Sequence, residues 1–365
     1  MSQLELLIEK MSKSSPEAVN TLNSSNDTIV EYLHIETDIE KKYLQILNDN
    51  KENKCLIFLC GSSGDGKSAI INRHIHKYQS YYDFHVDATH SFSPNQSAID
   101  ALSNEFEKFE NSNQSLVVGI NIGIMINFIN EVGYKFEKIQ EAIQNFLNRN
   151  TSTENIFFIN FEDYPKFYME DNDIKSPFIK NILKKITQQT EDNPFYNAYL
   201  EDIDKQHLFI EHKNLQLLSS EHIQNNIIHL LVISNLKYNQ FLTSKSLLDF
   251  IYTLLSSDNL LIDELFQNKT NDIIENISKE DPTQIRSFEI DKFIIERENK
   301  QADKELTNLI NHLNSVLNMK IFDDTDAKTL IRTIYLIQGI EFENYYINVP
   351  LKEYIDFFSD TYWYK

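Results

Sequence analysis

The chain has 365 residues, a hydrophobic fraction of 41% and a formal net charge of −21 at pH 7. This length suffices for two or three domains, and the acidity argues against strong autonomous binding to nucleic acid, which needs clustered lysine and arginine. Because no signal peptide is recognisable and the longest apolar stretch, residues 116–129, is too short to span a bilayer, we expect a soluble, cytoplasmic protein without membrane contact.

The first fifty residues predict a helical segment. Apolar spacing favours helices over residues 3–11, from about residue 15, and over residues 31–47. The polar residues 48–54 then read as a linker into a buried strand over residues 54–60. Cys55 and Cys60 lie five positions apart on that strand, so they should point to opposite faces as small buried side chains that cannot pair with each other.

A phosphate-binding loop follows this strand directly. Its residues, GSSGDGKS, complete the G-x-x-x-x-G-K-[ST] pattern: Gly61, Ser62, Ser63, Gly64, Asp65, Gly66, Lys67 and Ser68. The glycines let backbone N–H groups turn inward around a polyphosphate, and the helix that follows directs its positive end at the same place. Lys67 would reach the β- and γ-phosphates and Ser68 would ligate Mg²⁺. The alternative is a chance Gly/Ser-rich turn, which the correct strand and helix flanks disfavour.

Strands and helices then alternate. The pattern predicts strands over residues 82–86, 116–122 and 155–160, and helices over residues 68–78, 97–109 and 128–147. Such alternation implies a mostly parallel sheet covered on both faces, with ligands bound at the carboxyl ends of the strands. We therefore expect an α/β fold of the P-loop NTPase type.

After about residue 193 the pattern becomes helical. Residues 223–236, 244–257 and 307–317 are apolar at helical spacing. The expected organisation is an N-terminal helical segment (1–50), a P-loop nucleotide-binding domain (51–192) and an all-helical domain (193–365).

Hydrolysis would need a carboxylate for Mg²⁺ and a group that orients water or reads the γ-phosphate. The candidates for these roles are polar residues at the carboxyl ends of the expected strands: Asp87, with Thr89 and His90, Asn121, Asn160, Glu162 and Asp163. Geometry alone does not choose among them. Each also has a plain structural interpretation, since Asp87 could cap the next segment and Asn160, Glu162 and Asp163 could be turn residues.

Only five arginines occur in the chain, and two in the helical part could reach a triphosphate. These are Arg286 and Arg332, of which Arg286 is our candidate sensor. A surface salt bridge is the ordinary alternative for each.

Several segments together resemble one family. These are the loop at residues 61–68, DATHSFSPNQSAIDAL at 87–102, VVGINIGIMINF at 117–128 and INFEDYPKF at 159–167, with further likeness at 31–40 and 241–255. They are similar to the DNA phosphorothioation-dependent restriction protein DptF family. The resemblance implies a P-loop ATPase of a bacterial anti-phage restriction module, which works with companion restriction proteins and places its nucleotide at residues 61–68.

The leading hypothesis is therefore a Mg²⁺-dependent ATPase that binds ATP and whose nucleotide cycle moves the helical domain. Lys67 and Ser68 would act on phosphate and Mg²⁺, Asp163 or Asp87 would supply the carboxylate, and Asn160 and Arg286 would be sensors. DNA would be contacted through partner proteins, and a homo-oligomer is an open option. The alternatives are a nucleotide-dependent assembly switch without turnover, consistent with Asn121 in place of an acid on the third strand, and a P-loop small-molecule kinase.

Overall fold

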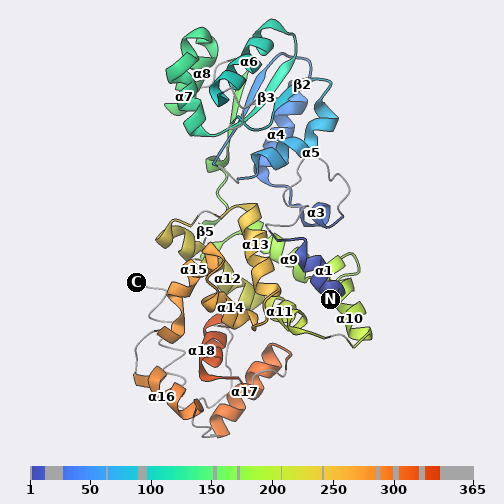
Figure 1. Cartoon of the computed structure of the whole chain (residues 1–365), viewed down its shortest axis with the longest axis vertical. Coiled ribbons are helices and arrows are strands. Elements are labelled where there is room, and N and C mark those ends of the chain that lie inside the picture. The colour runs from blue at the N-terminus through green and yellow to red at the C-terminus, as the bar shows by residue number, and fades with distance from the viewer. Residues whose placement is uncertain are drawn as a thin grey trace.

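The computed structural model describes residues 2–12, 28–62, 65–88, 97–150, 154–170, 173–206, 208–240, 242–284, 288–298, 304–319 and 325–337. They form an α/β region built on a parallel sheet and a helical region (Figure 1). None of the helices within these ranges is long and apolar enough to cross a membrane.

The sheet has four strands in the order β2-β3-β1-β4. The strands are β1 (Leu56–Cys60), β2 (Tyr82–His85), β3 (Ser115–Ile120) and β4 (Ile156–Asn160), and every pairing between them is parallel. The expectation of an α/β fold with a parallel sheet is confirmed. Because β1 pairs on both edges and is covered on both faces, all five of its residues are buried, as an uninterrupted apolar strand requires.

Helices cover both faces of the sheet. On one face lie α4 (Asp38–Asp49) and α5 (Lys67–Tyr78), and on the other α6 (Ala98–Asn111), α7 (Ile122–Val132) and α8 (Glu137–Leu147). Side chains of β1 alternate between the two cores, so Cys55 packs with α4 and α5 while Cys60 packs with α6 and α7. Both cysteines are buried and free, as predicted.

Two expected helices are each divided in the structure. The helix predicted over residues 31–47 is instead α3 (Thr28–Leu33) and α4, because the hydroxyl of Thr37 accepts the backbone N–H of Glu40 and starts a new helix. The helix predicted over residues 128–147 is α7, a short 3₁₀ turn η1 (Gly133–Lys135) and α8. Phe136, at φ −128° and ψ 62°, interrupts the helix and is buried in the same core as Ile139.

A short hairpin and many helices make up the rest of the described chain. After the 3₁₀ turn η2 (Phe161–Asp163) come β5 (Tyr168–Glu170) and β6 (Asp173–Lys175), an antiparallel pair that the sequence did not predict. The helices are α1 (Gln3–Glu9), α9 (Pro177–Thr187), α10 (Pro194–Asp204), α11 (Ile210–Leu218), α12 (Glu221–Tyr238), α13 (Ser244–Leu255), α14 (Leu261–Gln267), α15 (Asp272–Ile277), α16 (Phe288–Glu298), α17 (Lys304–Val316) and α18 (Ala327–Leu336), with 3₁₀ turns η3 (Ser278–Glu280) and η4 (Pro282–Gln284).

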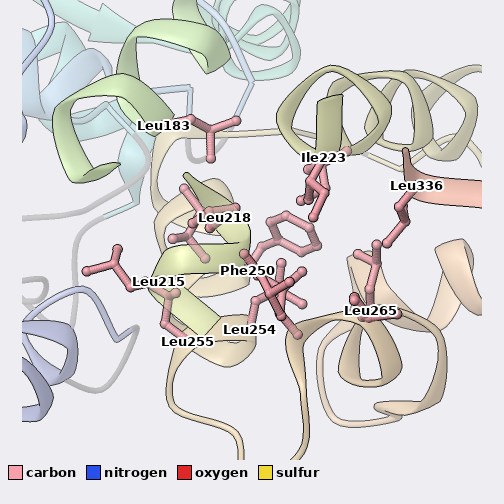
Figure 2. Packing of buried hydrophobic residues seen from close by; sticks show 14 of the residues in the cluster. Leu183, Leu215, Leu218, Ile223, Phe250, Leu254, Leu255, Leu265 and Leu336 are labelled. Carbon is pink, nitrogen blue, oxygen red and sulfur yellow. The ribbon is translucent and has the colours of Figure 1, made fainter. Parts of the chain in front are cut away.

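The helical region has one large core, which combines segments far apart in sequence. Figure 2 shows part of it, with Leu183 of α9, Phe250 of α13 and Leu336 of α18. Leu4 and Ile8 of α1 and Leu33 of α3 belong to the same core. Thus α1 and α3 pack with the helical region and α4 packs with the sheet; the boundaries expected at residues 50 and 192 stay predictions.

A buried carboxylate connects α4 to α5. Glu40 is 2% exposed and accepts contacts from His34 Nε2 at 3.0 Å and from His74 Nε2, on α5, at 2.8 Å. Burial alone would raise the pKa of Glu40, but the two histidines lower it to about 2. Beside them Arg73 of α5 holds both carboxylate oxygens of Glu31, at 2.6 and 2.7 Å. These contacts attach the N-terminal segment to α5.

Candidate functional site

The candidate site lies where β1 ends and α5 begins. Gly66 precedes the first helical residue, Lys67, with φ 108° and ψ 10°, a left-handed conformation that glycine adopts without strain. The N-cap residue, Gly66, has no side chain that could cap the first turn of α5. Within the described residues no capping hydrogen bond from a side chain is present there, and the helix dipole adds positive potential at the same place.

Gly61 is required for a different reason. A Cβ there would lie 2.9 Å from Oδ2 of Asp65 and 3.0 Å from Cδ2 of Phe161. The first glycine of the loop thus makes room for a carboxylate of the loop and for the aromatic ring that follows β4.

The ammonium group of Lys67 lies over the loop. Its Nζ donates to the carbonyl oxygens of Gly61 at 2.8 Å and of Ser62 at 2.6 Å, and the residue is 8% exposed. Burial lowers the pKa of Lys67, while the nearby carboxylates of Asp65 and Asp87 act in the opposite direction. This geometry leaves one of the three ammonium donors for another acceptor.

The residues present fit a nucleoside triphosphate with Mg²⁺. A buried strand leads into a glycine-bearing loop, an uncapped helix end and a lysine held over the turn, which are the parts that bind a polyphosphate. Ser68 is half-buried in the first turn of α5, where its hydroxyl could ligate Mg²⁺. The loop residues Ser63 and Gly64 lie outside the described residues.

The other candidate side chains gather at one edge of the sheet. The register aligns Cys60 with Ile120 and with Asn160, so the carboxyl ends of β1, β3 and β4 are level. Asp87 follows β2 at the same edge and is close enough to Lys67 to influence its pKa. Asp163 is more exposed than Asp87, and its charge raises the pKa of Cys60 and of Tyr164. Asp87 is half-buried and Asp163 is exposed, so Asp87 is the more enclosed of the two proposed carboxylates.

Three polar candidates have structural partners or exposed positions. Asn121 Oδ1 accepts the backbone N–H of Ile124 at 2.8 Å in the first turn of α7. Asn160 is 8% exposed, and its Oδ1 accepts the N–H of Glu162 at 3.3 Å, while Glu162 itself is exposed. Thr89, His90 and Arg286 lie outside the described residues.

Arg332 forms salt bridges, but they are buried in the helical region. The expectation of a salt bridge at the surface is therefore wrong. The guanidinium is 3% exposed and bonds Asp281 at 2.6 and 3.2 Å and Asp263 at 2.7 Å. Both partners belong to the helical region, because α18 packs against α14 and the turn that holds Asp281. Removing Arg332 would leave the two carboxylates without their shared cation, one of them fully buried.

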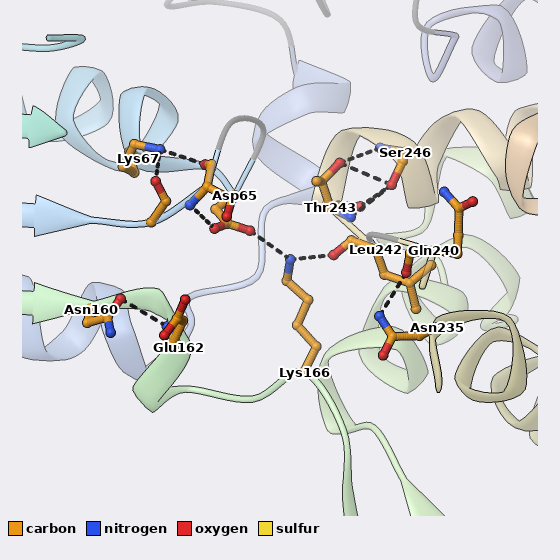
Figure 3. Close-up of polar contacts among 12 residues, drawn as sticks. Asp65, Lys67, Asn160, Glu162, Lys166, Asn235, Gln240, Leu242, Thr243 and Ser246 are labelled. Carbon is orange, nitrogen blue, oxygen red and sulfur yellow. Dashed lines mark hydrogen bonds and ion pairs between the residues drawn. The ribbon is translucent and has the colours of Figure 1, made fainter. Parts of the chain in front are cut away.

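The sequence interpretation missed Lys166. This lysine follows η2, on the connection from β4 to the helical region, and its Nζ lies 3.6 Å from Oδ1 of Asp65 in the loop (Figure 3). Burial lowers the pKa of Lys166, and the carboxylate of Asp65 opposes that shift. The sequence signal for Lys166 is its position in the INFEDYPKF segment, shortly after the candidate carboxylates Glu162 and Asp163.

Comparison with protein-family models finds no family that matches the chain. Comparison with curated proteins finds no match either.

Proposed function

We propose that this chain is a Mg²⁺-dependent ATPase whose nucleotide binds at residues 61–68. The observation that carries the proposal is the arrangement of Lys67: it opens an uncapped helix directly after a left-handed Gly66 and extends over the carbonyls of the loop. A buried lysine at the positive end of a helix favours a polyanionic ligand.

Each residue of the site has a role in this proposal. Lys67 binds the β- and γ-phosphates, and Ser68 and Asp87 hold Mg²⁺. Asn160, at the carboxyl end of β4, is the proposed sensor of the γ-phosphate. Asp163 is the second choice for the carboxylate, and Glu162 and Arg286 stay candidates without a structural argument. Bound Mg²⁺ would neutralise the charge that develops on the phosphoryl oxygens.

This ATPase would belong to a phosphorothioation-dependent DNA restriction complex. The support is that the segments at residues 87–102, 117–128 and 159–167 resemble the DptF family. Under this proposal the chain works in the cytoplasm with companion restriction proteins, and the contact with DNA belongs to those partners because the chain carries a net charge of −21.

Nucleotide binding tests the site directly. Lys67→Ala should abolish the rise in melting temperature that Mg²⁺-ATP gives the wild-type chain, because a ligand that binds only the folded state stabilises it. Lys77→Ala, an exposed change at the other end of α5, is the matched control and should keep the shift. A shift of wild-type size in the Lys67 variant would contradict the site.

Phosphate release separates the proposed ATPase from its alternatives. Turnover that is lost in Lys67→Ala and reduced at least tenfold in Asp87→Asn would support hydrolysis with Asp87 as the metal carboxylate. Binding without release of phosphate would favour the assembly switch, and transfer of labelled γ-phosphate to an added acceptor would favour the kinase.

A further inference from the structure

Lys166 contacts both regions of the molecule. Its backbone lies on the connection that leaves the sheet after η2, and its ammonium donates to the carbonyl of Leu242, next to the N-cap of α13 (Figure 3). The hydroxyl of Ser176, the N-cap of α9, donates to the Lys166 carbonyl. The lysine is thus fixed to the helical region at both ends while its ammonium faces the phosphate loop.

The carboxylate of Asp65 lies between this ammonium and the loop. Asp65 Oδ2 accepts the backbone N–H of Ser62 at 2.6 Å, and its Oδ1 is 3.6 Å from Lys166 Nζ. Inward backbone N–H groups of such a loop are the donors that bind phosphate oxygens. The carboxylate therefore uses a donor that a phosphate would also use, and the two anions repel each other.

The contact between Lys166 and Asp65 is long for a half-buried ion pair. Charge-assisted N–H···O bonds are usually about 2.7–2.9 Å long, and the exposed pairs Lys175–Glu170 and Lys180–Glu221 measure 2.7 and 3.1 Å. The side chains of Lys166 and Asp65 are 23% and 16% exposed. A largely desolvated ammonium with a distant counter-ion would be stabilised by a second anion nearby.

We propose that Lys166 binds the terminal phosphate of the nucleoside triphosphate at this loop and transmits its presence to α13 through Leu242. The inference rests on the proposed function and extends it, since it assigns γ-phosphate recognition to a residue of the connection between the two regions. A diphosphate lacks the group that Lys166 recognises. Lys166 is therefore a phosphate-binding residue that distinguishes ATP from ADP.

Equilibrium binding of Mg²⁺-ATP and Mg²⁺-ADP to the full chain, measured by calorimetry, tests the assignment. Lys166→Met should weaken ATP binding about tenfold or more, the value of one charge-assisted hydrogen bond, and should change ADP binding less than about twofold. Lys166→Arg keeps the charge and should recover part of the ATP preference. Lys180→Met, which removes an exposed lysine paired with Glu221, is the control and should bind both nucleotides as the wild type does.

Hydrogen exchange of the wild-type chain supplies a readout that needs no variant. ATP, and not ADP, should change the protection of the backbone amides at the start of α13, near Thr243 and Ser246. Equal effects of the two nucleotides there would overturn the proposal even if the variants failed to fold.

The outcomes distinguish this inference from the proposed function. A wild-type chain that binds neither nucleotide overturns both. A wild-type chain that binds nucleotide, with a Lys166→Met variant that binds ATP unchanged or loses ATP and ADP equally, leaves the ATPase proposal standing and overturns the role of Lys166.

Discussion

At the scale of single residues, two glycines are needed for different reasons. Gly66 needs a left-handed conformation, whereas Gly119 on β3 needs space. A Cβ on Gly119 would lie 2.3 Å from the carbonyl oxygen of Val86, where the chain leaving β2 lies against β3 and the Ala88 N–H bonds the Gly119 carbonyl at 2.9 Å. This contact holds the segment that carries Asp87.

Gly119→Ala should therefore destabilise the fold. Backbone atoms cannot move aside as a flexible side chain does, so we expect a loss of about 3 kcal/mol in the free energy of unfolding, measured with urea. Gly123→Ala in α7 is the control, because a Cβ there meets only Asn121 Oδ1 at 3.3 Å, and alanine favours helix by about 1 kcal/mol. Equal stabilities of the two variants would refute the constraint at Gly119.

The strand and the helix that flank residues 61–68 lie where the sequence predicts them, because the pattern is local and eight consecutive residues carry it. Phosphate binding by these residues stays a prediction. Lys166 could not be predicted, since its partners Asp65 and Leu242 are far from it in sequence. The burial of Arg332 was missed for the same reason, because Asp263 and Asp281 reach it only through tertiary packing.

At the scale of elements, apolar spacing located the four strands of the parallel sheet within one or two residues but did not find the hairpin of β5 and β6 or the breaks at residues 34–37 and 133–136. Both breaks serve packing. Thr37 begins α4 so that this helix covers the sheet, and Phe136 leaves helical geometry to enter the core. Periodicity continues across such breaks, so the sequence alone predicts one long helix.

The attachment of α4 to α5 should weaken in acid. Glu40 has a pKa of about 2 in the folded chain against an ordinary value of 4.5, so its stabilisation is complete above pH 4.5 and is lost as the pH falls toward 2. Glu40→Gln should lower the free energy of unfolding at pH 7 by about 3 kcal/mol, and this difference should shrink below pH 4.5.

Urea titrations of the wild type and this variant from pH 7 to pH 3 measure the effect. Glu36→Gln, an exposed change in the same segment, should differ from wild type by less than about 0.5 kcal/mol throughout. If the difference caused by Glu40→Gln stays constant down to pH 3, the histidine contacts do not hold the carboxylate ionised.

At the scale of the whole molecule, charge governs the choice of partners. With a net charge of −21, the isolated chain should not bind duplex DNA at micromolar concentrations and physiological salt, because few counterions would be released. Fluorescence anisotropy with modified and unmodified duplexes, with and without Mg²⁺-ATP, measures this. Tight binding that falls steeply with salt would reveal a basic groove and would remove the need for a DNA-contacting partner.

The shared core of α1 and the later helices joins segments that are far apart in the sequence. The amides of Gln3 and Leu4 donate to Asp202 at 3.0 Å each, across 199 and 198 positions of sequence. During synthesis the sheet and its helices emerge before α10, and a sheet that has already folded draws α3 and α9 together, which shortens the effective loop that must close. We therefore expect early folding of the sheet to favour closure of a core that, among the described residues, contains no side chain of the four parallel strands.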